Sequence, residues 1–292
     1  MELPAPVRAA GERILGWQPV VTGRAVLTRY GEAGGALLAG GLTYNALFAL
    51  LPALLLIVAV LGFVVDDPER RQAVVDAIGT ALPPLRGLLE ASLDELIRGA
   101  RGNGALGLVG LAWGASRFYG ALDEAFARIF SGAPKRGFLP RMVRGILSVG
   151  LLVSGLLVAL ILTGIASFLA DQAAGRFGAF SFDVWGVASP VLAAVVLVVG
   201  TLVIYRIVPA RRVHWRAAIP PAILVGVSIA LLTQLFSYIA PRLVGTAALF
   251  GTFVAVFAAM VWMSTAFQLL LVGAAWVRER LGPPGPPFLG DA

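Results

Sequence analysis

Polar side chains and a proline interrupt a long uncharged run near the start of the chain. The run from Ala36 to Val65 contains no charged residue. Tyr44, Asn45 and Pro52 lie within it, where a simple membrane anchor would carry leucine. Because Pro52 has no amide hydrogen, the carbonyl of Phe48 loses its helical partner and a kink is expected. That carbonyl and the Asn45 amide are suited to hydrogen bonding with a polar solute or with a neighbouring helix.

Further polar residues lie in two later apolar runs. Gln234 and Tyr238 share one helical face, and Gln268 lies in the last run. If these faces converge with Asn45, they line a neutral cavity suited to a polar solute or a lipid headgroup. The alternative is hydrogen bonding between helices, with Trp262 filling space in the core.

Few residues are suited to enzymatic chemistry. The single histidine, His214, lies in a basic loop and the chain has no cysteine, so we expect neither a metal site nor a cofactor. Asp123 and Glu124 are the acidic candidates for action on a lipid near the membrane surface. A lipid-directed enzyme is therefore only a remote alternative, and we expect no enzymatic activity.

The elements that would position these residues are membrane spans. Hydrophobic residues make up 59% of the 292 residues and charged residues 13%, against about a quarter in soluble domains. Roughly twenty apolar residues cross a bilayer core as a helix. Six runs are candidates: Ala36–Val65, Gly104–Tyr119, Gly145–Ala170, Val184–Val208, Ala217–Ala240 and Leu243–Val277. The prediction is an all-α, polytopic transmembrane helix bundle of six spans. Whether the second run crosses completely is left open, because its purely apolar part ends near Ala115.

The basic residues favour one orientation of these spans. With six spans, 16 of the 23 Lys and Arg residues fall on one side, which the positive-inside rule makes cytoplasmic. Both termini are then cytoplasmic, with a segment 1–35, a transmembrane domain 36–277 and a disordered tail 278–292. The arginines are shared among loops, which argues against nucleic acid as a partner. Arg211, Arg212 and Arg216 are the candidates for binding anionic headgroups at the inner leaflet.

Two segments have the spacing of amphipathic interfacial helices. One covers 85–97 within the predicted outer loop 66–103. The other covers 118–130 and is expected to continue the second span on the cytoplasmic side. There an apolar stripe of Phe118, Leu122, Phe126 and Ile129 lies opposite Arg117, Asp123, Glu124 and Arg128.

Three stretches together resemble the YihY/BrkB family of bacterial inner-membrane proteins. They are AGGLTYNALFALLPALLLI at 39–57, VIYRIVPARRVHWRAAIPPAIL at 203–224 and ALFGTFVAVFAAMVWMSTAFQLLLVGAAW at 248–276, the last with Gly251 and the central Trp262 of the motif. Where the family usually has Tyr-Gly and Asn, this chain has Phe250 before Gly251, and Ala127. The resemblance implies six spans and a cytoplasmic-membrane location. Some members have carried a ribonuclease label, which the lack of an acidic or His cluster argues against.

The sequence therefore predicts a non-enzymatic protein of the cytoplasmic membrane. The leading hypothesis is that it moves a polar solute or an anionic lipid, with Asn45, Pro52, Gln234, Tyr238 and Gln268 along the path. The alternative is an envelope scaffold whose amphipathic segments hold partner proteins. Membrane lipids are the expected partners, with a homo-oligomer or envelope proteins as further candidates.

Overall fold

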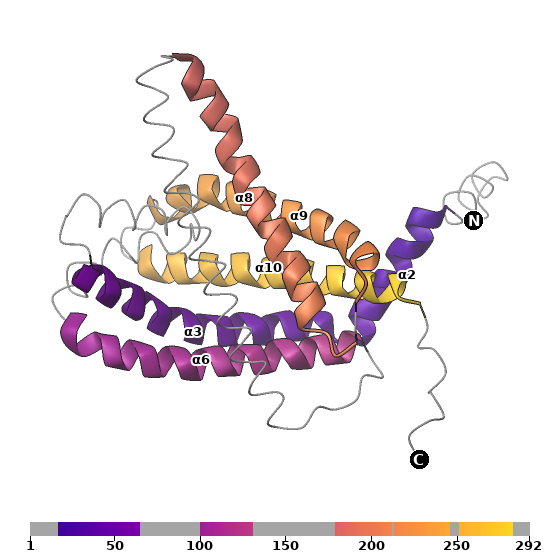
Figure 1. The fold of residues 1–292 in the computed structure, drawn as a ribbon, viewed down its shortest axis with the longest axis horizontal. Helices are drawn as coiled ribbons and strands as arrows, with labels where there is room; N and C mark the ends of the chain where they lie inside the picture. Colours follow the sequence, from indigo (N-terminus) through magenta and orange to yellow (C-terminus); the bar gives the residue numbers. More distant parts are fainter. Residues whose placement is uncertain (1–16, 65–99, 131–178, 212, 246–250, 283–292) are drawn as a thin grey trace, which may run out of the picture.

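The computed structural model describes residues 17–64, 100–130, 179–211, 213–245 and 251–282. All of the secondary structure in these ranges is helical. The helices, labelled as in Figure 1, are α2 (Gln18–Glu32), α3 (Gly35–Val64), α6 (Ala100–Ile129), α8 (Ala179–Ile207), α9 (Trp215–Gly245) and α10 (Gly251–Arg280).

Several of these helices have the length and composition of membrane spans. Among the described residues, stretches of α8 (Pro190–Ile207), α9 (Trp215–Ile239) and α10 (Val256–Arg280) are long and apolar enough to cross a bilayer. A fourth candidate is a bent pair, in which α2 and the first half of α3 meet at 62°. The protein is thus an all-helical membrane protein with three or four candidate spans in its described part.

The bend between α2 and α3 depends on two glycines. Gly34 has φ of +69°, a left-handed conformation that costs glycine little and ends α2. At Gly35 an ideal Cβ would lie 2.1 Å from the ring of Tyr30, so that only glycine lets this ring fold over the turn. The prediction for residues 1–35 was a cytoplasmic segment, and helix α2 within it was not predicted.

Helix α10 is the central element of the described fold. It contacts α9, α3 and α2, while α3 lies along α6 and α8 pairs with α9. Figure 1 shows α3, α6, α9 and α10 lying along roughly the same axis, with α3 and α9 antiparallel to α6 and α10, and with α2 turned away at one end. In the same view α8 slants away from the other helices toward its N-terminal end. Close packing of all the helices is therefore expected at one end only.

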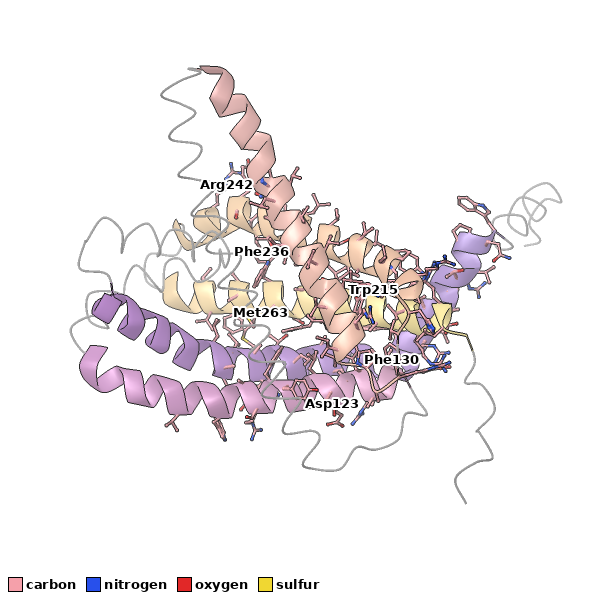
Figure 2. All side chains as sticks on the ribbon, in the orientation of Figure 1. Asp123, Phe130, Trp215, Phe236, Arg242 and Met263 are labelled. Carbon is pink, nitrogen blue, oxygen red and sulfur yellow. The ribbon has the colours of Figure 1, made fainter. Side chains whose placement is uncertain are left out.

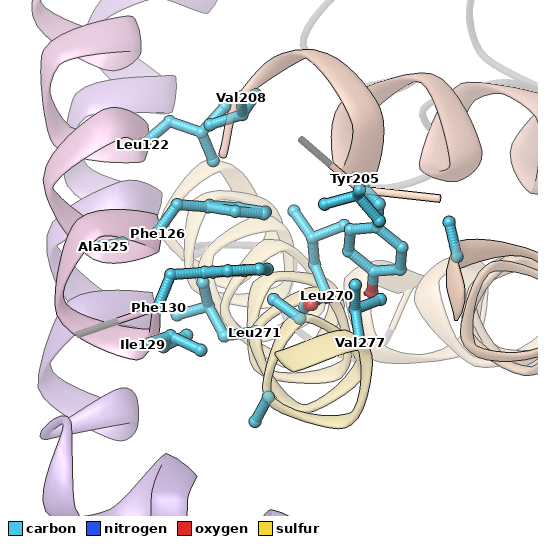
Figure 3. Close-up of a cluster of buried hydrophobic side chains, with 14 of the residues drawn as sticks. Leu122, Ala125, Phe126, Ile129, Phe130, Tyr205, Val208, Leu270, Leu271 and Val277 are labelled. Atoms are coloured by element: carbon cyan, nitrogen blue, oxygen red, sulfur yellow. Dashed lines mark hydrogen bonds between the residues drawn. The ribbon is translucent and has the colours of Figure 1, made fainter. Parts of the chain in front are cut away.

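The main hydrophobic core lies at that end. It joins the last turns of α6, α8 and α10 to the first turns of α3 and α9, and to Val26 of α2. Figure 3 shows Phe126 of α6 and Phe130, the residue after this helix, stacked beside Leu271 of α10, with the two phenylalanine ring centroids 6.1 Å apart. We call this region, around Phe126, Tyr205 and Leu271, the packed end.

The second predicted span continues into the predicted amphipathic helix as one element, α6. Leu122, Phe126 and Ile129 of the predicted stripe are buried, and Phe118 packs against their cluster. Asp123, which was predicted to lie opposite the stripe, is also buried, at 8% exposure. Several elements pack around this part of α6, so a position turned away from the stripe can still be covered.

Several predicted boundaries differ from the structure. The sixth predicted span began at Leu243, but the chain from Leu243 to Gly245 belongs to α9, which runs past Pro241. Proline removes one backbone hydrogen bond, a loss that membrane helices tolerate. Helix α10 extends to Arg280, so the predicted disordered tail begins too early, at 278. The third predicted span, Gly145–Ala170, and the outer segment 85–97 lie outside the described residues.

Candidate functional site

The predicted polar site on α3 is occupied by contacts of the protein with itself. Asn45 donates from Nδ2 to the carbonyl oxygen of Gly41 at 2.8 Å, one turn earlier in its own helix. Tyr44 is 55% exposed and packs its ring on Phe48, with centroids 4.7 Å apart. Helix α3 runs through Pro52 without a break in its helical assignment. The Asn45 amide is thus already used in a local hydrogen bond.

The Phe48 carbonyl, which lacks a helical partner because of Pro52, lies against α6. An ideal Cβ on Gly114 would come within 3.0 Å of this oxygen and 2.7 Å of the Ala49 Cα. Such a close approach between helices needs glycine and suits a weak Cα–H···O contact. The freed carbonyl therefore lies in a contact between two helices.

Among the side chains that the structure describes, the candidate residues on α9 and α10 form no hydrogen bond with those on α3. Gln234 is exposed, and Tyr238 is 61% exposed with the guanidinium of Arg242 3.8 Å from its ring centroid. Gln268 donates to the Ser264 hydroxyl at 3.4 Å, within α10. Each of these interactions stays within one helix, which is how polar side chains are satisfied when they face lipid or a helix surface.

The two motif residues of the last span have different positions. Gly251 is the first residue of α10. Trp262 is half-buried, and its Nε1 is enclosed without a hydrogen-bond partner among the described residues. A buried indole N–H usually has a partner, so Trp262 fills space at some cost in free energy.

Tyr205 connects three helices at the packed end, and the polar-site prediction missed it. Its side chain is fully buried and its hydroxyl donates to the Leu270 carbonyl at 2.8 Å, from α8 to α10 (Figure 3). Gly273 makes room for it, since an ideal Cβ there would lie 2.1 Å from the hydroxyl oxygen and 2.5 Å from Val225 of α9. Tyr205 lies in the family-like stretch 203–224, which was the available sign of its importance.

Three consecutive side chains in the last turn of α10 contact three different parts of the structure. Arg278 donates from Nη1 to the Gly282 carbonyl, closing the C-terminus of its own helix. Glu279 forms an ion pair with Arg29 of α2. Arg280 donates from Nη2 to the Arg216 carbonyl of α9 at 3.2 Å. The sequence analysis did not connect these residues, because α2 was not expected.

Basic and aromatic side chains surround this end of the bundle. The guanidinium of Arg206 lies 3.8 Å from the ring centroid of Trp215, which is 57% exposed. Figure 2 labels Trp215 beside the ends of α2 and α10, where nitrogen atoms gather. Of the predicted headgroup residues, Arg216 is exposed and Arg211 is half-buried, while Arg212 lies outside the described residues. Arginine beside tryptophan is the usual composition of a membrane interface.

The apolar helices and the basic, aromatic end together define an integral membrane protein. Comparison with known proteins then identifies the family. The model for the family described as "Virulence factor BrkB" matches residues 26–281, and the chain belongs to this family. The predicted resemblance to the YihY/BrkB family is confirmed.

Curated relatives are named only as membrane proteins. A UPF0761 membrane protein of Rhodospirillum rubrum is 27% identical over 247 residues, which cover 83% of this chain and 54% of the relative. A UPF0761 membrane protein of Psychrobacter sp. is 25% identical over 240 residues, which cover 80% of this chain and 44% of the relative. A UPF0761 membrane protein of Chromohalobacter salexigens is 27% identical over 270 residues, which cover 88% of this chain and 63% of the relative. The chain spans about half the length of the Psychrobacter and Rhodospirillum relatives. No solved structure matches it.

Proposed function

We propose that this protein crosses the cytoplasmic membrane six times, with both termini inside, and moves or helps to move an anionic lipid across or within that membrane. No enzymatic step is part of the proposal. The observation that carries it is the group of basic side chains at the packed end, where Arg206 lies on the ring of Trp215, Arg280 bonds to the Arg216 carbonyl and Arg29 pairs with Glu279. Anionic headgroups of the inner leaflet are attracted to such a surface.

A polar solute is the less favoured cargo. A hydrated path through the bundle needs polar groups turned toward one shared interior. Asn45 and Gln268 instead make their hydrogen bonds within their own helices, and Gln234 is exposed on α9. Large apolar side chains are exposed beside them, including Leu231, Leu235 and Val261. These surfaces suit contact with acyl chains better than contact with water.

Reconstitution into vesicles tests lipid movement directly. The vesicles carry a fluorescent phosphatidylglycerol in both leaflets, and a membrane-impermeant quencher reports how fast the inner population reaches the outer leaflet. We expect the protein to speed this exchange beyond that of empty vesicles, and to act less on a fluorescent phosphatidylcholine. Equal rates with and without protein would refute lipid movement and favour an envelope scaffold.

Cysteine labelling separates a lipid from a solute. The chain has no cysteine, so single replacements Asn45→Cys, Gln234→Cys and Gln268→Cys are read without background. With a membrane-impermeant thiol reagent applied from each side of the membrane in turn, we expect all three to stay unlabelled, while an exposed control, His214→Cys, is labelled from the cytoplasmic side. Labelling of all three would reveal a water-filled path and replace the lipid by a polar solute.

A further inference from the structure

Three arginines from distant parts of the chain come together at the packed end. Arg29 comes from α2, Arg211 from the connection between α8 and α9, and Arg278 from the last turn of α10. The positive charges of Arg29 and Arg211 both act on Arg278. Glu279 is the acidic side chain that acts on the same group, through its ion pair with Arg29. Within the part of the chain that the structure describes, one carboxylate against three guanidinium groups leaves an excess of positive charge.

Arg278 has unused hydrogen-bonding capacity in this group. The residue is only 6% exposed, and its Nη1 donates to the carbonyl of Gly282. Its Nε is enclosed and has no hydrogen-bond partner among the described residues. Burying a charged donor without an acceptor is costly, and the two nearby positive charges add repulsion. An anion placed here would relieve both costs.

We propose that Arg278, Arg211 and Arg29 form a binding site for a phosphate group. Guanidinium groups present N–H donors in a planar fork that matches the oxygen atoms of phosphate, and several of them share its charge better than one. The proposed function makes a phospholipid headgroup the expected source, and this inference rests on it for that choice alone. Inorganic phosphate has the same recognisable chemistry, so the experiment separates the two.

Glu279 provides a substitution for which the proposed site predicts tighter, and not weaker, binding of phosphate. Its carboxylate pairs with Arg29 and so competes with any anion for that guanidinium group. Removing its charge with Glu279→Gln frees Arg29 while it weakens the connection between α2 and α10. A site for phosphate then binds more tightly although the protein has lost an ion pair. A purely structural role for these arginines predicts no gain in binding.

The experiment measures ligand binding to the full chain in an uncharged detergent. A ligand that binds only the folded protein raises its unfolding temperature with a concentration dependence that gives the affinity. The probes are a short-chain phosphatidylglycerol, the matching phosphatidylcholine and inorganic phosphate. We expect phosphatidylglycerol to bind more tightly than phosphatidylcholine. Inorganic phosphate binding as tightly as phosphatidylglycerol would assign the site to the free anion.

Substitutions then locate the binding. Arg278→Gln is expected to weaken phosphatidylglycerol binding about tenfold or more, since it removes charge-assisted hydrogen bonds. Arg128→Gln is the matched control, because it removes one positive charge from the same end of the bundle, at an exposed ion pair with Glu124. Should Arg278→Gln fail to fold, Arg211→Gln takes its place, as its side chain is half-buried in a connection between helices.

The outcomes are distinct for the site and for the function. Equal affinities of Arg278→Gln, Arg211→Gln and Arg128→Gln would overturn the site, as would looser binding by Glu279→Gln. If vesicle exchange of phosphatidylglycerol is present and Arg278→Gln leaves it unchanged, the site fails and the function stands. If the wild type binds phosphatidylglycerol through Arg278 without exchanging it, the site stands and movement of lipid fails.

Discussion

The two ends of the same helices are packed very differently. On α9, buried residues occur at Ala217, Ala218, Pro221, Ala222, Val225 and Gly226, and from Val227 to Ile239 none is buried. On α8, Thr201 and Tyr205 are buried, whereas every residue from Pro190 to Gly200 is at least partly exposed. Helices α8 and α9 thus contribute to a core at the packed end and present apolar side chains outward along their other parts, which we call the open half.

Residue size explains this difference. In a bilayer, leucine gains little by leaving lipid for a neighbouring helix, so helices associate where small residues allow close approach. Gly226 and Gly273 lie where α9 and α10 meet α8, and alanines make up much of the remaining contact surface. Beyond this point α9 presents large residues such as Leu231 and Leu235, which are exposed. Small residues therefore mark where the helices meet.

The largest expected effect comes from Gly226→Ala. An ideal Cβ at this position would lie 2.6 Å from the Cα of Val198, and because that atom is backbone, α8 and α9 have to separate. We expect a loss of about 3 kcal/mol in the free energy of unfolding, at the upper end for overpacking. The measurement is unfolding in mixed detergent micelles followed by circular dichroism.

Gly200→Ala is the matched control for that substitution. Nothing lies within 4 Å of an ideal Cβ at Gly200, although the residue is close to Val198 on α8. Alanine in a helix interior is favoured over glycine by roughly 0.5–1 kcal/mol, so we expect a small gain in stability. A loss at Gly200 equal to that at Gly226 would show that the close contact between α9 and Val198 is not what makes alanine costly at Gly226.

Gly273→Ala is expected to destabilise the packed end by about 2 kcal/mol. The new methyl group meets the hydroxyl oxygen of Tyr205, which lies 2.1 Å from the ideal Cβ position. Removing that oxygen with Tyr205→Phe relieves part of the clash, although alone it costs about 1 kcal/mol for the lost hydrogen bond to Leu270. A double-mutant cycle measures this coupling. Strictly additive losses would mean that Tyr205 and Gly273 do not share this space.

Arg29→Gln is expected to have a smaller effect. The Arg29–Glu279 pair connects α2 to α10, but its side chains are 29% and 27% exposed, so solvent screens the interaction. We expect a loss of about 1 kcal/mol or less in unfolding free energy, falling further at high salt. Limited proteolysis near Gly34 is the more sensitive readout, since α2 should detach before the bundle unfolds. Unchanged cleavage at low salt would show that Val26 and its neighbours hold α2 alone.

The sequence predicted the apolar helices better than the contacts between them. Long uncharged runs locate α3, α8, α9 and α10 because span length is set by the bilayer. The hydrogen bond from Asn45 to the Gly41 carbonyl could also have been predicted, since the two residues lie four positions apart on one helical face. The approach of Arg29 to Arg278 could not be predicted, because it depends on a bend at Gly34 and on helix packing across 248 intervening residues, which no local sequence pattern indicates.

The smallest expected effect is in the open half, at Gln234. Its side chain is exposed on α9, beyond the last buried residue of that helix, so it supports no packing. Gln234→Leu should therefore change the free energy of unfolding by less than about 0.5 kcal/mol. If lipid is the cargo, this substitution also leaves phosphatidylglycerol exchange unchanged, because the acyl chains meet leucine as readily as glutamine. A marked loss of exchange with normal stability would show that the open half carries a polar route, and that the packed end alone does not explain the function.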